Sequence, residues 1–174
     1  RSFMGQVGVT YFIEPIKTNI SLNGGYQWKR QTTLQNDNQQ KYTWKSWAFS
    51  PYLTSQPCKY VELAYNGMFA KTYLSTKYQN NSYLSQQHKV SLKLMPFDGF
   101  TFDTSADIVK NELTKDVSKT MSLFDMGLSY RKKAMKISFD IRNILNQRQY
   151  AYTIYNSVNT FTYNYLLRGR ECVC

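Results

Sequence analysis

Along almost the whole of this chain, side chains alternate between apolar and polar with a period of two residues. That period places neighbouring side chains on opposite faces of a β-strand, whereas a helix repeats about every 3.6 residues. The alternation predicts nine strands, at 2–13, 18–32, 41–54, 60–72, 84–95, 100–112, 120–131, 135–146 and 160–174. We therefore expect an all-β chain.

Many of the predicted strands exceed the roughly five or six residues that are usual in soluble sheets. They match the roughly 9–11 residues that cross a bilayer on a tilt. No window approaches the roughly 18 apolar residues that a spanning helix needs, which excludes a helical membrane protein. An aromatic content of 16% also excludes a disordered chain.

The connections between the predicted strands alternate between tight and long. The tight ones lie near 14–17, 55–59, 96–99 and 132–134, and the long, polar ones near 33–40, 73–83, 113–119 and 147–159. Outer-membrane barrels have short periplasmic turns and long outer loops. The pattern predicts an antiparallel up-and-down transmembrane β-meander within a larger outer-membrane β-barrel. Pro51 is unexpected inside a paired strand, and we expect a bulge there.

The odd number of strands predicts an incomplete domain. If the tight turns face the periplasm, the first strand starts outside and the ninth ends inside, whereas a complete bacterial barrel has an even number of strands. We therefore expect 1–174 to be the C-terminal portion of an outer-membrane β-barrel domain, truncated at its N-terminus.

One side of each predicted strand is apolar, and in a membrane barrel that side faces lipid. The residues expected to face lipid are Ile20, Leu22, Val61, Leu63, Phe69, Val90, Leu92, Leu94, Phe100, Phe102, Ile108, Ile137, Phe139 and Ile141. The other side carries charges of both signs, which predicts a charge ladder inside the wall. Its members are Glu62, Asp103, Asp107, Asp140, Lys89, Lys93, Lys136 and Arg142.

Aromatic residues gather near the long connections and predict a girdle at the outer membrane surface. The girdle residues are Tyr26, Trp28, Trp44, Trp47, Tyr150, Tyr152, Tyr163 and Tyr165. Ordinary ring packing across the strands of a soluble sheet is the alternative. The net charge of +11 suggests a polyanionic partner, either nucleic acid or lipid phosphates, and does not choose between them.

Three C-terminal segments, at 139–147, 150–153 and 163–171, resemble the closing strands of TonB-dependent outer-membrane receptors of the Bacteroidetes type. The motif residues are Asn143, Ile144, Leu145, Asn146, Arg168, Arg170 and Glu171. The resemblance implies a plugged barrel of about 22 strands that imports a scarce nutrient, such as an iron chelate or a glycan. It also implies, as partners, outer-membrane lipid, the rest of the barrel with its plug, and a TonB-type energising complex. The ending at Cys172 to Cys174 lacks the family's terminal aromatic residue, which predicts truncation there too.

We find no catalytic, cofactor-binding or metal-binding constellation, and expect neither an enzyme nor a nucleic-acid partner. His88 is the only histidine and is expected to be a wall residue. Connections 73–83 and 147–159 are the segments expected to touch ligand. Two alternatives remain open: a small stand-alone outer-membrane barrel, adhesive or structural, and a soluble basic β-domain that binds nucleic acid.

Overall fold

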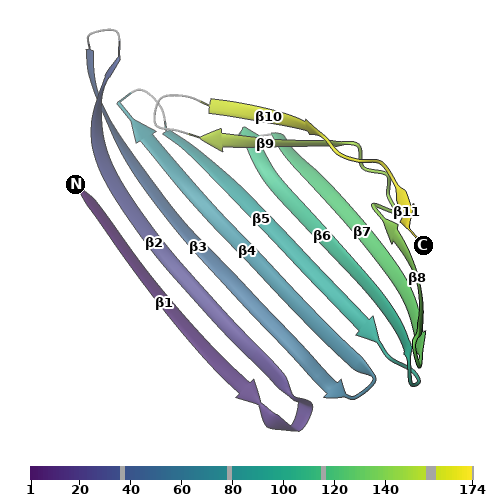
Figure 1. Cartoon of the computed structure of the whole chain (residues 1–174). Coiled ribbons are helices and arrows are strands. Elements are labelled where there is room, and N and C mark those ends of the chain that lie inside the picture. The colour runs from purple at the N-terminus through teal and green to yellow at the C-terminus, as the bar shows by residue number, and fades with distance from the viewer. Residues whose placement is uncertain (36–37, 78–79, 115–116, 156–159, 174) are drawn as a thin grey trace.

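The computed structural model describes residues 1–35, 38–77, 80–114, 117–155 and 160–173. Within them, nine strands form one antiparallel sheet, in which each strand from β1 to β7 pairs with the next and β8 pairs with β11 (Figure 1). Their bounds are β1 (Ser2–Ile13), β2 (Thr18–Gln35), β3 (Asn38–Cys58), β4 (Val61–Thr76), β5 (Asn80–Leu94), β6 (Phe100–Thr114), β7 (Val117–Lys132), β8 (Met135–Arg142) and β11 (Glu171–Val173). The predicted all-β meander is confirmed. The sheet is open, with β1 and β11 at its edges.

The tight connections lie together at one end of the sheet, which we call the turn end (Figure 1). Between β1 and β2, the single turn η1 (Glu14–Ile16) contains Pro15, and Lys17 closes it with a φ of 44°. Before β6, Gly99 has a φ of 82°, and a Cβ there would lie 2.1 Å from the carbonyl oxygen of Arg131. Only glycine tolerates both conditions.

At the opposite end, which we call the loop end, the prediction of long connections was wrong. Strand β2 continues to Gln35 and β3 begins at Asn38, with Thr33 paired to Gln40. The segments 73–83 and 113–119 likewise lie largely within paired strands. Polar Asn, Gln and Thr residues end the apolar pattern there, but their backbones still form a β-ladder.

The prediction of one strand at 160–174 was also wrong. Strands β9 (Gln149–Tyr155) and β10 (Thr160–Leu166) form a separate hairpin, and β11 alone returns to the sheet. The strand predicted at 135–146 stops at Arg142 because Asn143 and Asn146 adopt positive φ angles of 52° and 53°. The hairpin crosses the loop end, where β9 contacts β6 and β7 (Figure 1).

Pro51 interrupts pairing without the predicted bulge. It pairs with Leu22 of β2, but the ladder between β3 and β4 lapses between Phe49 and Tyr52 while the register is kept. Proline has no N–H to donate, which accounts for the lapse. Gly67 lies opposite, where a Cβ would approach the Pro51 ring to 2.9 Å. The register irregularity in β3 lies further along, between Ser55 and Cys58.

The sheet forms a single layer. The chain exposes 12532 Å² of surface, whereas a compact monomer of 20.5 kDa exposes about 8,900 Å². Among the residues whose side chains are described, Tyr42 is the one buried hydrophobic residue. The stability of this sheet in water therefore cannot come from a conventional core.

Candidate functional site

The strand register separates the side chains into two contrasting faces. All the residues predicted to face lipid lie on one face, which we call the apolar face; the opposite one is the polar face. In one row across the strands, Val61, Leu94, Phe102, Leu128 and Phe139 are aligned. Another row aligns Tyr11, Ile20, Leu53, Tyr65 and Val90.

Within the described part of the chain, no second layer covers the apolar face. Leu22, Val90 and Ile137 expose 42%, 39% and 59% of their surface. Leaving apolar surface in water costs about 25 cal/mol for each Å². A face of this extent needs an apolar environment to be stable.

The apolar residues form a band that crosses the strands diagonally. On β2 the apolar run extends from Ile20 to Trp28, and on β8 from Met135 to Ile141. Across the paired strands, the register aligns Ile141 of β8 with Thr18 of β2. The apolar run of β8 therefore ends, on its loop-end side, at the level where the apolar run of β2 begins on its turn-end side.

This diagonal gives the tilt of the strands relative to the band. The centre of the band shifts by about 1.5 residues per strand, which corresponds to a tilt of about 45° at a rise of ~3.3 Å and a strand spacing of ~4.8 Å. Membrane barrels have strand tilts of about 35–45°. A run of about nine residues at this tilt spans about 20 Å, close to the ~25 Å apolar height of such barrels.

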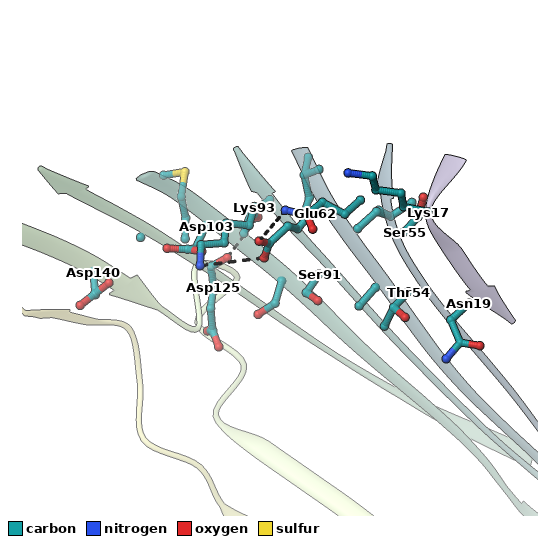
Figure 2. A pocket seen from close by; sticks show the side chains of 18 of the residues that line it. Lys17, Asn19, Thr54, Ser55, Glu62, Ser91, Lys93, Asp103, Asp125 and Asp140 are labelled. Atoms are coloured by element: carbon teal, nitrogen blue, oxygen red, sulfur yellow. Dashed lines mark hydrogen bonds and ion pairs between the residues drawn. The ribbon is translucent and has the colours of Figure 1, made fainter. Parts of the chain in front are cut away.

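The polar face is concave. A hollow of about 660 Å³ on this face is lined by residues from every strand between β1 and β8. Figure 2 shows its polar side chains, among them Asn19, Thr54, Glu62, Ser91 and Asp103, pointing into the hollow. Polar inside and apolar outside is the reverse of the arrangement in a soluble protein.

The predicted charge ladder is confirmed only as an alignment of opposite charges. Lys93 lies between Glu62 and Asp103 in one row, and Lys89 lies opposite Asp107. On this face, Glu62 with Lys93 is the one pair within ion-pair distance among the described residues, at 4.0 Å. Asp107 instead accepts a hydrogen bond from Gln87 Nε2 at 3.2 Å.

The Glu62–Lys93 pair is expected to contribute little to stability. Both side chains are more than 40% exposed, and an exposed pair contributes about 0–1 kcal/mol. Glu62→Gln should therefore change the free energy of unfolding by less than about 1 kcal/mol, as measured by urea titration. A loss several times larger would show that the hollow is much less hydrated than its exposure indicates.

The residues that carry the family resemblance meet in one cluster, which we call the Asn143 junction. Asn143 is buried, and its Nδ2 donates hydrogen bonds to the carbonyl oxygens of Gln147 and Arg168, both at 2.8 Å. Its Oδ1 accepts from Gln147 N at 2.8 Å, and its backbone N donates to Asp125 Oδ1 at 2.8 Å. One side chain therefore joins the end of β8, the start of the hairpin and the return to β11.

The second half of the motif completes this junction. Arg170 donates to the carbonyl oxygen of Ile144 from Nε at 3.0 Å and from Nη2 at 2.6 Å. Asn146 Oδ1 accepts from Arg170 N at 3.1 Å, and Arg168 forms an exposed ion pair with Glu171 at 3.6 Å. Leu145 is 55% exposed and takes no part in these hydrogen bonds.

The aromatic residues predicted to form one girdle are divided among the apolar face of the sheet, its polar face and the hairpin. Tyr26, Trp28 and Trp47 lie on the apolar face about halfway along β2 and β3, at the loop-end border of the apolar run, whereas Trp44 lies on the polar face, opposite Lys29. The other four belong to the hairpin, where Tyr150 pairs with Tyr165 and Tyr152 with Tyr163; Tyr150, Tyr163 and Tyr165 share one of its faces, and the side chain of Tyr152 lies outside the described part. The Tyr163 and Tyr165 rings stack with their centroids 6.4 Å apart.

His88, Cys58 and Cys172 lie on strands of the sheet. His88 lies on the apolar face, with Nδ1 2.9 Å from the Tyr65 hydroxyl and its ring edge-on to Phe69. Cys58 and Cys172 are exposed free thiols. The described residues contain no group of three or more His, Cys, Asp or Glu side chains that could hold a metal ion, and no helix among them could span a membrane.

Two structural roles were missed from the sequence, those of Gly127 and of the Asn143 side chain. Asp140 lies over Gly127, where a Cβ would be 2.6 Å from Asp140 Oδ1, so the glycine gives this carboxylate its place on the polar face. A glycine inside a strand was the available signal. The side-chain hydrogen bonds of Asn143 could not be deduced, because its partner Arg168 lies 25 residues along the chain.

Comparison of the chain with family models, curated proteins and solved structures gave no match.

Proposed function

We propose that this chain is part of the membrane-spanning wall of a bacterial outer-membrane β-barrel, of the TonB-dependent receptor type. The observation that supports it best is the uncovered apolar band, whose diagonal course matches the strand tilt of membrane barrels. The concave polar face would line the lumen. The open edge strands β1 and β11 would pair with further strands of the barrel, since exposed edges are a liability when left unpaired.

The receptor class rests on the C-terminal motif. The Asn143 junction gives these residues a shared structural role, because it directs the β9–β10 hairpin across the loop end of the sheet. In the proposed receptor the loop end faces the outside, so the β9–β10 hairpin would stand at the mouth of the lumen. The lipid, the plug, the TonB-type energising complex and an imported nutrient are its proposed partners.

Two measurements on cells test this function. In cell fractionation, the complete protein should appear in the outer-membrane fraction and resist extraction by alkaline carbonate. Deleting its gene should slow growth on one limiting nutrient, either a ferric chelate or a glycan, and an uncoupler of the inner-membrane proton gradient should abolish uptake of that nutrient.

The outcomes separate the proposal from its rivals. A protein found in the soluble fraction would refute the membrane wall. Outer-membrane location with normal growth and energy-independent uptake on all these nutrients would refute the receptor class and favour a stand-alone barrel.

A further inference from the structure

A line of cations borders the apolar band along its loop-end edge. On four strands, a basic residue is the first residue on the apolar face beyond the apolar run, towards the loop end. These residues are Arg30 beyond Trp28 on β2, Lys45 beyond Trp47 on β3, Lys71 beyond Phe69 on β4, and Lys110 beyond Ile108 on β6. We call them the basic belt.

The basic belt follows the same diagonal as the apolar band. Arg30 pairs with Thr43 of β3. On the same face of β3, Lys45 lies two residues nearer the turn end than Thr43. Lys45 pairs with Tyr73 of β4. On the same face of β4, Lys71 lies two residues nearer the turn end than Tyr73. Once the strands are tilted to level the band, these cations lie at one height above it. A set of charges at a constant depth matches a planar layer of opposite charge.

The charge on this edge is mostly positive, although Glu112 lies two residues beyond Lys110 on the same face of β6. Arg30, Lys45 and Lys110 are exposed, and Lys71 is half-buried, with its Nζ 5.6 Å from the centroid of the Tyr73 ring. Glu112 is the one carboxylate on the apolar face of the described strands. It is aligned with Lys71 across the sheet, two strands away, and accepts a hydrogen bond from Leu84 N at 2.7 Å. The other strand carboxylates lie on the polar face or within the junction.

The apolar face has a groove over β1, β2 and β3, beside Lys45 and Lys71, which neighbour its Trp47 along β3 and across the ladder to β4. Gly5 and Gly24 form its floor, Val7, Tyr26, Trp47 and Phe49 form its walls, and its volume is about 680 Å³. Because the two glycines lack side chains, the groove can take the end of an acyl chain. A cationic pair beside an apolar groove is complementary to a lipid with an anionic headgroup.

We propose that Lys45 and Lys71 bind the phosphate of an anionic membrane lipid whose acyl chain occupies the groove over Gly24, with Arg30 and Lys110 extending the site along the leaflet. This site rests on the proposed membrane location. A lipid phosphate is favoured over nucleic acid because the apolar face continues beyond the aromatic residues next to the cations into aliphatic rows of Ile, Leu and Val, which a nucleic acid would not cover. Each basic residue at an anionic leaflet contributes a modest attraction, so a set at one height binds appreciably.

The test compares two lipids with the same acyl chains, dioleoyl phosphatidic acid and dioleoyl phosphatidylcholine, by native mass spectrometry of the complete protein in detergent. The double variant K45A/K71A should lower the affinity for phosphatidic acid by about 10- to 30-fold and leave that for phosphatidylcholine nearly unchanged. The matched double variant K29A/K89A removes two lysines from the polar face and should change neither affinity.

A third variant tests the groove alone. At Gly24 an added Cβ meets no atom closer than 3.8 Å, so Gly24→Leu fills the groove without disturbing the backbone. It should weaken both lipids by a similar factor.

Several results would overturn the site. Equal loss of phosphatidic acid in both double variants would overturn it, as would displacement of the lipid by millimolar inorganic phosphate. Tighter, Lys45- and Lys71-dependent binding of a single-stranded oligonucleotide would point to nucleic acid instead. If the protein stays monodisperse in plain buffer and binds no lipid, the proposed membrane location is refuted. If it needs detergent but K45A/K71A binds phosphatidic acid as tightly as the wild type does, only the lipid site is refuted.

Discussion

Val90→Arg should lower the free energy of unfolding from a bilayer by about 2–4 kcal/mol, the cost of a lipid-facing arginine at the bilayer midplane of a β-barrel. Val90 lies near the middle of the apolar band, in the row of Tyr65 and Ala106, and is 39% exposed. In hydrocarbon its guanidinium would lose its hydration, and the neighbouring apolar side chains offer no counter-charge.

The adjacent residue supplies the matched control. Ser91 lies on the polar face and lines the hollow, so Ser91→Arg places the same charge in water and should change stability by less than about 1 kcal/mol. Both values are measured by urea titration of the complete protein refolded into phosphatidylcholine vesicles. Equal costs for the two variants would mean that the two faces meet similar surroundings.

Asn143→Asp should have the second large effect, a destabilisation of about 2–4 kcal/mol. The substitution keeps the acceptor for Gln147 N but replaces the Nδ2 donor with a carboxylate oxygen 2.8 Å from two carbonyl oxygens. The new charge would also lie near Asp125, which already binds Asn143 N. Hydrogen exchange should show lost protection in the β9–β10 hairpin, which the junction directs.

Asn146→Asp is the control for that variant. Asn146 has nearly the same positive φ, 53° against 52°, but it is exposed, and its oxygen accepts from Arg170 N. Asp keeps that acceptor, so the change should be small. If Asn146→Asp destabilises the hairpin as strongly as Asn143→Asp, the backbone conformation, and not the side-chain hydrogen bonds of Asn143, carries the effect.

The sheet was predictable because its alternation is local. The period of two assigned Ile20, Val61, Val90 and Ile141 to one face correctly, and the register aligns them as expected. The ends of the strands at the loop end were not predictable from that signal. Polar residues such as Thr33 and Gln40 carry no facial pattern, so paired backbone looked like loop.

The C-terminal arrangement depends on contacts that are distant in sequence. Asn143 connects the end of β8 to the segment between the hairpin and β11 through its hydrogen bond to the Arg168 carbonyl oxygen, and no periodicity reports that contact. The diagonal of the apolar band was likewise hidden, because it appears only when the register between strands is known. The prediction placed Trp44 in the girdle because it is aromatic and lies towards the loop end. Its position in the alternation of β3, opposite Lys29, puts it on the polar face instead.

The most direct test of the central claim is a cysteine scan of 61–69 on β4 in the complete protein, with Cys58, Cys172 and Cys174 first replaced by serine. The protein is embedded in vesicles and treated with a membrane-impermeant thiol reagent, while spin-labelled lipids report contact with hydrocarbon. We predict lipid contact and no labelling at 61, 63, 65 and 69, and labelling without lipid contact at 62, 64 and 66. Labelling of both sets from water, with no period of two, would contradict the account.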